Sequence, residues 1–491
     1  MLVGGLDIGT TGAKLAIYND KVKLFDTFYI GYDVKRVNGN DEICFKTIFE
    51  KVLSLLKQAS EKYLIDAIAV TTFGESFTML DENDNILTPT MIYTDSRGEN
   101  EIKEIVNILG EKKIALKTGV KPHAMYSLAK VLWIKHNMSD AYNKAKRILL
   151  GQDYIVYMLS GVAQIDYSLA ERTQYFNIES KKYDDEILKI AGIDISLLSK
   201  PVEMGTLAGK IKLELAKKYN LNANMLIYNG CHDQIANMFG SGVFDEFTAM
   251  DGSGTIECLC AVLTKIPDYD FFEKGYCLVP YLNNTYATYA FSYGGCCCIK
   301  EFKEKYALNE LRYCEENNID FYNHFESNFK NELTDLFILP YFTGAGTPYM
   351  DQNVKGSVIN MSFETTIYDL YQSLLESISF ELRINYDALR EYGVNIKSVK
   401  ASGGGSNSKL WVQMKSDVLN VSFKRLDCKE IGCAGTVLIL LKSMNLIDDI
   451  YEGYKLLNIE KEIINPSFEK HKLYLKKYDR YKNIYKTIKN I

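Results

Sequence analysis

The sequence of 491 residues has no long hydrophobic run, no excess of basic residues and no disulfide framework. No stretch approaches the roughly 18–20 apolar residues of a membrane-spanning helix, so we expect no membrane partner. The net charge of −6 gives no electrostatic reason to expect a nucleic-acid partner. The first residues, MLVGGLDIGTTGAK, lack the basic segment of a secretory signal peptide, and we expect a cytoplasmic protein.

Two common nucleotide-binding motifs are also missing. The chain has no G-x-x-x-x-G-K-[ST] phosphate loop, and no G-x-G-x-x-G follows a strand as in a dinucleotide fingerprint. Its 11 cysteines follow no zinc spacing, since Cys258 and Cys260 are one residue apart and Cys296, Cys297 and Cys298 are consecutive. We interpret them as small buried side chains in a reducing compartment.

What the sequence does contain is an alternation of apolar strands with helical patterns, which predicts an α/β fold with mixed sheets. At about 150 residues per domain, the length fits two or three domains. Strands are expected at Leu2–Asp7, Lys14–Tyr18, Ile65–Thr71 and Val394–Ala401, and helices at about Phe45–Tyr63, Phe363–Tyr392 and Lys409–Leu419. The last segment, Phe468–Ile491, is rich in lysine and tyrosine and is predicted to be a solvated surface helix.

A strand that leads into a glycine and threonine turn occurs twice. The first copy is Asp7-Ile8-Gly9-Thr10-Thr11-Gly12, and the second is Asp251-Gly252-Ser253-Gly254-Thr255. Each copy follows an apolar run and begins a new half of the chain. The repetition predicts two domains, residues 1–244 and residues 245–491, with their boundary near Val243–Phe247.

The first turn has the composition of a phosphate-binding site. A glycine-rich hairpin can direct its backbone N–H groups at an anion, while threonine hydroxyls and Lys14 add donors and positive charge. Asp7, directly before the turn, is suited to hold a water of a bound Mg²⁺, because this ion prefers carboxylate oxygen and keeps several waters. An ordinary hairpin is the alternative.

A third glycine-rich segment, Gly403-Gly404-Gly405-Ser406-Asn407, lies between a predicted strand and a predicted helix. Glycines at this place allow a flat ligand to approach the backbone closely. The side chain of Asn407 either binds such a ligand or caps the helix.

Asp233 lies between the apolar run Met225–Tyr228 and a helical pattern that begins at Ile235. A carboxylate at this strand-to-helix turn can accept the proton of a substrate hydroxyl as the hydroxyl attacks phosphorus. The alternative is that Asp233 only caps the helix. The neighbouring His232 is expected to be a packed or hydrogen-bonded side chain.

Together these segments resemble the motifs of the FGGY carbohydrate kinases, a family with the two-domain actin-like ATPase (ribonuclease H-like) fold and a cleft between the domains. Asp7–Lys14 resembles their first phosphate motif, Gly252–Thr255 their second, and Ala401–Asn407 their adenosine motif. Met125–Ile134 resembles a further family signature, whereas the signature expected at Gly356–Glu376 is degraded. The departures indicate a divergent member.

The resemblance implies that the chain transfers the γ-phosphoryl group of ATP, with Mg²⁺, to a small sugar or polyol. Asp233 matches the catalytic aspartate of the family, and Asp7 is the implied magnesium residue. The implied ATP-binding residues are Gly9, Thr10, Thr11, Lys14, Gly254, Thr255, Gly404, Gly405 and Asn407. Homodimers are common among such kinases, so a homodimer is one expectation.

The acceptor segment, Thr71–Thr78, lacks the Met-His-Gly motif of xylulokinases, and its Thr-Phe-Gly portion is similar to fuculokinases. Glu75 falls where glycerol kinases carry a polyol-binding glutamate, so Glu75, Asp233 and Gln234 are the candidate acceptor-binding residues. We expect Glu75 to be an uncompensated carboxylate that disfavours an anionic acceptor such as gluconate. A place in a surface loop is the alternative for Glu75. A neutral ketose is modestly favoured over a polyol.

Two other classes of protein share parts of this pattern. Actin-fold chaperones and switches carry similar loops, but the chain leaves no residues for a separate peptide-binding domain. A kinase fold kept as a catalytically silent sensor of sugar and ATP is the other alternative. Phosphorylation by the wild type but not by Asp233→Ala separates the kinase from both.

Overall fold

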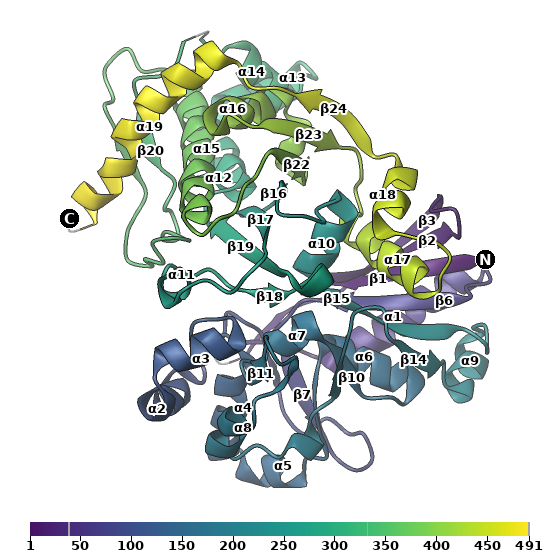
Figure 1. The fold of residues 1–491 in the computed structure, drawn as a ribbon. Helices are drawn as coiled ribbons and strands as arrows, with labels where there is room; N and C mark the ends of the chain where they lie inside the picture. Colours follow the sequence, from purple (N-terminus) through teal and green to yellow (C-terminus); the bar gives the residue numbers. More distant parts are fainter. Residues whose placement is uncertain (38–39, 331, 490–491) are drawn as a thin grey trace. The chain divides into compact units, whose positions relative to one another are not determined.

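The computed structural model describes residues 1–37, 40–330 and 332–489. The chain divides into two compact units (Figure 1). The first unit contains Met1–Phe244, Cys277–Tyr286 and Glu430–Asn458, and the second contains the rest of the chain from Asp245 on. The boundary at residue 244 is as predicted, but two later segments, Cys277–Tyr286 and Glu430–Asn458, belong to the first unit rather than to the second. Within the described ranges, no helix has both the length and the apolar character needed to cross a membrane.

The first unit is built on a mixed sheet with the strand order β14-β15-β6-β1-β2-β3. Strand β1 pairs antiparallel with β2 and parallel with β6, which in turn pairs parallel with β15. The strands are β1 (Leu2–Ile8), β2 (Gly12–Asn19), β3 (Leu24–Gly31), β6 (Ala67–Thr72), β14 (Leu207–Lys210) and β15 (Leu226–His232). This sheet confirms the strands predicted in the first part of the sequence.

The sheet of the second unit repeats the pattern, with the consecutive order β19-β17-β16-β22-β23-β24. Strand β16 pairs antiparallel with β17 and parallel with β22, which pairs parallel with β23. The strands are β16 (Thr248–Ser253), β17 (Glu257–Leu263), β19 (Tyr286–Ser292), β22 (Ser398–Ser402), β23 (Ser422–Leu426) and β24 (Glu460–Ile464). In both units a central hairpin contains the glycine turn, as the repetition in the sequence indicates.

Helices surround both sheets (Figure 1). Helix α15 begins at Ile367 rather than at Phe363, because Thr366 and Asp369 form a capping box at its start. The first unit contains α1 (Phe45–Ser60), α2 (Glu99–Leu109), α3 (Glu111–Thr118), α4 (Ser127–Asn137), α5 (Ser139–Lys144), α6 (Gly151–Ser160), α7 (Tyr167–Glu171), α8 (Asp185–Ala191), α9 (Leu213–Tyr219), α10 (Asp233–Ser241), α17 (Ile431–Ser443) and α18 (Ile450–Leu457). The second contains α11 (Tyr269–Glu273), α12 (Cys296–Glu301), α13 (Leu308–Glu316), α14 (Phe321–Ser327), α15 (Ile367–Glu391), α16 (Lys409–Leu419) and α19 (Phe468–Ile488).

Short strands complete the fold. Those of the first unit are β4 (Lys35–Val37), β5 (Asn40–Ile43), β7 (Phe77–Leu80), β8 (Thr90–Met91), β9 (Arg147–Leu150), β10 (Gln164–Asp166), β11 (Phe176–Asn177), β12 (Lys182–Tyr183), β13 (Lys200–Val202) and β18 (Val279–Pro280). Those of the second unit are β20 (Phe337–Leu339) and β21 (Ser357–Ile359).

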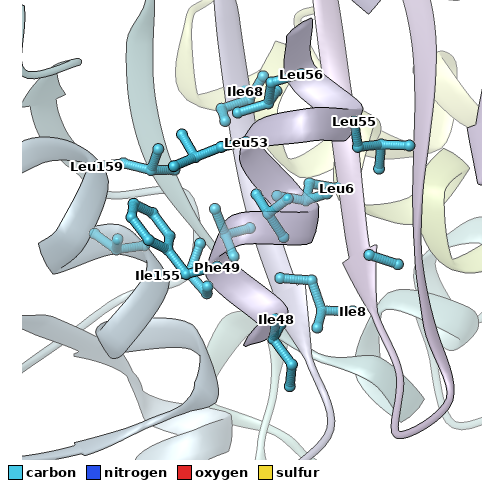
Figure 2. Close-up of a cluster of buried hydrophobic side chains, with 14 of the residues drawn as sticks. Leu6, Ile8, Ile48, Phe49, Leu53, Leu55, Leu56, Ile68, Ile155 and Leu159 are labelled. Atoms are coloured by element: carbon cyan, nitrogen blue, oxygen red, sulfur yellow. The ribbon is translucent and has the colours of Figure 1, made fainter. Parts of the chain in front are cut away.

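The core of the first unit lies between the sheet and helices α1 and α6 (Figure 2). Helix α1 is amphipathic, and its apolar side chains Phe49 and Leu53 are buried beside Leu6 of β1 and Ile155 of α6. Burial of such side chains contributes about 1.5–3 kcal/mol each, so this face stabilises the first unit.

Helix α17 packs against β1, β6 and α10 so closely that glycines line the contact. A Cβ atom on Gly5 would lie 2.3 Å from the carbonyl oxygen of Cys433, and one on Gly240 would lie 2.1 Å from that of Ile431. No side chain larger than hydrogen fits at these positions. The start of α17 is thereby held beside the strand that carries Asp7.

Helix α19 is less solvated than the sequence predicts. Lys477 is buried, and its Nζ atom donates to the carbonyl oxygen of Thr334 at 2.6 Å and forms an ion pair with Glu376. Tyr474, Tyr478 and Tyr481 are buried as well. The prediction of a solvated helix is wrong for this face, because lysine and tyrosine combine long apolar parts with a polar tip. Residues 490 and 491 of the predicted segment lie outside the described part.

Candidate active site

The first turn joins β1 to β2 as a tight hairpin. The Gly9 N–H donates to the Gly12 carbonyl at 2.9 Å, and the Tyr32 hydroxyl donates to the Gly9 carbonyl at 2.5 Å. The backbone N–H groups of Thr10 and Thr11 donate to no other described residue. The tip of the turn therefore keeps two donors for a ligand, while Gly9 itself is used to close the turn.

Asp7 and Lys14 face each other across this hairpin. Burial raises the pKa of Asp7 to about 6, although Lys14 opposes the shift. Lys14 is not free, since its Nζ atom pairs at 2.7 Å with Glu430, the residue before α17. Sequence reasoning missed Glu430, because no local pattern links a residue near the end of the chain to the first hairpin.

Glu75 lies between β6 and β7 in a left-handed backbone conformation, with φ of +64°. It is only 6% exposed, so the alternative of a surface loop is wrong. Its carboxylate is also not uncompensated, because Oε1 lies 3.5 Å from Nη1 of Arg172. The expectation of an unpaired charge is thus corrected by a buried partner that follows α7.

Arg172 links the acceptor segment to α7. Its Nε atom pairs with Glu171 at 2.5 Å, and its guanidinium lies 5.4 Å from the ring centre of Tyr126. A Cβ atom on Gly74 would lie 2.8 Å from Cγ of Arg172, so glycine at position 74 makes room for the arginine. Sequence reasoning missed Arg172, because no local pattern links it to Glu75, which lies 97 residues earlier in the chain.

Asp233 is the first residue of α10, directly after β15. No side chain caps the start of this helix, so the alternative that Asp233 only caps the helix is wrong. The Asp233 side chain is 28% exposed, and its Oδ1 atom lies 3.2 Å from Nε2 of His232. Burial lowers the pKa of His232 well below its ordinary value, which keeps the imidazole neutral.

The pKa of Asp233 is raised to about 8, chiefly by the surrounding protein and then by the negative charges of Asp7 and Glu75. Removal of the carboxylate from water is the largest cause of this shift, and repulsion by the two further carboxylates adds to it. Asp233, Asp7 and Glu75 thus form one electrostatic group within the first unit. The side chain of Gln234, the next residue, is partly exposed.

The second turn, in the other unit, joins β16 to β17. The Gly254 N–H donates within the turn to the carbonyls of Gly252 at 3.0 Å and Ile256 at 3.1 Å. Two backbone N–H groups at the start of α12 hold the turn from the side, since Cys296 donates to Gly254 and Cys297 donates to Thr255. Gly254 and Thr255 remain exposed.

The third glycine segment follows β22 and forms one turn of 3₁₀-helix, Gly404–Asn407, before α16. A Cβ atom on Gly404 would meet no atom within 4 Å, so this glycine borders open space. Ser408, rather than Asn407, caps α16, with its hydroxyl accepting from the Trp411 N–H at 2.9 Å. The alternative of Asn407 as the cap is therefore wrong, and its side chain is exposed.

Similarity to known proteins agrees with these features. The FGGY family of carbohydrate kinases matches with its N-terminal domain over residues 2–240 and its C-terminal domain over residues 271–444. The xylulose kinase of Staphylococcus epidermidis is 24% identical, covering 100% of this chain and 97% of its own. The gluconokinase of Bacillus subtilis is 26% identical, covering 90% and 88%.

Two solved structures share the fold. The ligand-bound xylulose kinase from Lactobacillus acidophilus has a TM-score of 0.89 at 21% identity, covering 99% of this chain and 98% of its own. The Plasmodium falciparum glycerol kinase with ADP has a TM-score of 0.85 at 20% identity, covering 98% of each chain. The predicted actin-like ATPase fold is confirmed. The chain belongs to the FGGY family of carbohydrate kinases and is an ATP-dependent sugar phosphotransferase.

Proposed function

We propose that the acceptor is a neutral sugar and that Asp233 is the general base for phosphoryl transfer to it. The observation that carries the proposal is the Asp233 carboxylate at the start of α10, partly exposed and with its pKa raised to about 8. A base whose pKa lies near the working pH combines a useful deprotonated fraction with a strong driving force for proton transfer.

In the proposed reaction the acceptor hydroxyl gives its proton to Asp233 while its oxygen forms a bond to the γ-phosphorus of ATP. The bond from that phosphorus to the bridging oxygen breaks, and ADP leaves with the electron pair. Neutral His232, 3.2 Å from Asp233, supports the carboxylate without adding a competing positive charge.

ATP is proposed to bind through the three glycine segments. The phosphates bind at Gly9, Thr10, Thr11, Gly254 and Thr255, and Lys14 exchanges its Glu430 partner for a phosphate oxygen. The adenosine lies against Gly404 and Gly405, with Asn407 as a polar contact. The open space at Gly404 supports this placement, because a flat ligand can approach the backbone there.

Asp7 is the proposed carboxylate for Mg²⁺. Among the residues that the structure describes, no group of three His, Cys, Asp or Glu side chains could hold a metal ion. A single carboxylate fits Mg²⁺, which takes most of its ligands from water and phosphate oxygens. Gly432 leaves room at this carboxylate, since a Cβ atom there would lie 2.7 Å from Oδ2 of Asp7. The ion supplies neutralisation of the triphosphate charge.

The acceptor is proposed to contact Glu75, Asp233 and Gln234. Because Glu75 is paired with Arg172, its own charge does not exclude an anionic acceptor. Arg172 is already enclosed by two carboxylates, Glu75 and Glu171, and has no surplus charge for a third. A neutral acceptor is therefore favoured, and we propose a ketose, with a polyol as the alternative. A domain cleft, a homodimer and a cytoplasmic location stay predictions from the sequence.

The testing experiment is an ADP-release screen with Mg-ATP against neutral ketoses, polyols and aldonates, run on the wild type and on Asp233→Ala. We expect one neutral acceptor to stimulate ADP release, and we expect the variant to lose about 10²–10⁴-fold in kcat while it still binds ATP. Sugar phosphorylation by the variant near the wild-type rate would contradict Asp233 as the general base. ATP binding without stimulation by any acceptor would favour the silent sensor.

A further inference from the structure

A buried lysine holds both strands of the second hairpin. Lys415 of α16 is 1% exposed, and its Nζ atom donates to Oδ2 of Asp251 at 2.8 Å and to Oγ of Ser253 at 2.6 Å. The same Nζ atom forms an ion pair with Glu257, the first residue of β17. One ammonium group therefore contacts β16 and β17 just before and just after the exposed turn at Gly254 and Thr255.

Ser253 also borders the third glycine segment. A Cβ atom on Gly403 would lie 2.6 Å from the Ser253 carbonyl oxygen, and one on Gly405 would lie 2.6 Å from the Ser253 Cβ atom. The two segments are thus in direct contact at the residue that Lys415 binds. A displacement of Ser253 would be transmitted to both.

The lysine itself is held rigidly. Its Nζ atom lies 4.2 Å from the ring centre of Trp411, one turn earlier on α16. The Trp411 indole N–H donates to the carbonyl of Leu375 on α15 at 3.2 Å. Lys415 is therefore linked through Trp411 to both α16 and α15, and through its own ammonium group to the hairpin.

Stability alone does not account for this charged group. Burial of two carboxylates and one ammonium is costly, and apolar side chains of similar volume often hold a core equally well or better. Burial and the nearby Asp251 raise the pKa of Glu257 well above its ordinary range, which indicates that one lysine does not fully compensate both carboxylates.

We propose that Lys415 is a positioning residue for ATP: it holds the second turn and the third glycine segment in the mutual arrangement that the nucleotide needs, without touching the nucleotide. This inference rests on the proposed ATP site. It assigns to one side chain the task of keeping the phosphate-binding and adenosine-binding segments in register.

The first test is Lys415→Met, with Lys477→Met as the matched control. Lys477 is another buried lysine of the same unit that pairs with a glutamate, but it lies on α19. We expect both variants to lose thermal stability. Only Lys415→Met should weaken ATP binding, by about 10-fold or more as measured by calorimetry, with the KM of the acceptor unchanged. Equal ATP affinities in the two variants would overturn the proposal.

A second variant keeps the proposal testable if Lys415→Met does not fold. The combined substitution Lys415→Met, Asp251→Asn and Glu257→Gln removes every charge of the group at similar volume. If the lysine only neutralises carboxylates, this variant recovers both thermal stability and ATP affinity, which would refute positioning. If the lysine positions the segments, stability recovers while ATP affinity stays low.

The proposed ATP site has its own separate test. Gly404→Val adds a side chain whose Cβ atom meets no other residue's atom within 4 Å, so a loss of affinity there reports on the ligand itself. Unchanged ATP affinity in Gly404→Val would contradict the nucleotide site. A loss in Gly404→Val together with unchanged affinity in the combined variant would contradict only the role of Lys415.

Discussion

Three features of the site raise the pKa of the Asp233 carboxyl group. The surrounding protein, Asp7 and Glu75 all disfavour the charged carboxylate, and together they raise its pKa to about 8. A base works only in its deprotonated form, so a raised pKa removes activity as the pH falls. The same group of carboxylates that prepares the base thus sets the lower limit of its working range.

We expect kcat/KM for the acceptor to fall as the pH decreases through about 8, well above the ordinary carboxyl range. A cation at Asp7 removes one of the repelling charges, so higher Mg²⁺ should move this acid limb to lower pH. The measurement is a series of pH profiles from about 5 to 10 at several Mg²⁺ concentrations. A rate that stays constant down to pH ~5 would contradict an Asp233 base of raised pKa.

Glu75→Gln tests the acceptor contact at a second residue. The substitution keeps the shape but removes the charge, and loss of a charge-assisted hydrogen bond costs about 1.5–3 kcal/mol. We expect the KM of a neutral acceptor to rise about 10-fold or more, with the KM of ATP unchanged.

Glu171→Gln is the matched control for this substitution. Glu171 is equally buried and also pairs with Arg172, but it is not proposed to contact the acceptor. We expect the acceptor KM to change less in this variant than in Glu75→Gln, because Glu171 does not contact the acceptor. If both variants raise the acceptor KM alike, the effect comes from the changed charge around Arg172. That result would contradict a direct contact between Glu75 and the acceptor.

At the scale of elements, the hairpins and helices could be predicted because their patterns are local. Alternating strands, glycine turns and helical periodicity place β1, β2, α1, α15 and α16 within a few residues of where the structure has them. The partners of the charged residues could not be predicted in this way. Glu430 meets Lys14, and Arg172 meets Glu75, across long stretches of chain, and no spacing in the sequence records such contacts.

The third glycine segment predicts how the size of the side chain at position 404 affects ATP binding. Gly404 borders open space, so the Cβ atom of an alanine or a valine there meets no other residue's atom within 4 Å. We expect Gly404→Ala to weaken ATP binding less than Gly404→Val, with the thermal midpoint of both close to the wild type. Calorimetric titration with ATP measures the affinities. A lowered thermal midpoint with unchanged affinity would mean that this glycine serves the fold rather than the ligand.

For the whole molecule, family membership and fold agree with the motifs, whereas the acceptor does not follow from them. Relatives named for xylulose and for gluconate match the chain at 24% and 26% identity, so overall similarity does not choose between them. The choice depends on a few side chains. One of these, Arg172, compensates the negative charge of Glu75. This pairing could be recognised only from the fold, which brings the two residues together.

Removal of divalent cations tests the role of Asp7 for the whole enzyme. With a chelator present, we expect acceptor-dependent ADP formation to stop while the thermal midpoint without ATP stays unchanged. The reason is that the described residues offer no multi-carboxylate metal site that could stabilise the fold. Added Mg²⁺ should restore turnover in the wild type, and Asp7→Asn should need a higher Mg²⁺ concentration. Equal Mg²⁺ requirements in both would exclude Asp7.

Helix α17 has a consequence for synthesis on the ribosome. The first unit takes its central strand from the beginning of the chain and this covering helix from near the end. The glycine contacts of this helix, with Gly5 of β1 and Gly240 of α10, cannot form until residues 431–443 have been translated. The nascent protein therefore carries a sheet that lacks this covering helix through much of its translation. Its first unit matures only after nearly all of the second has emerged, so the order of folding is not the order of the sequence.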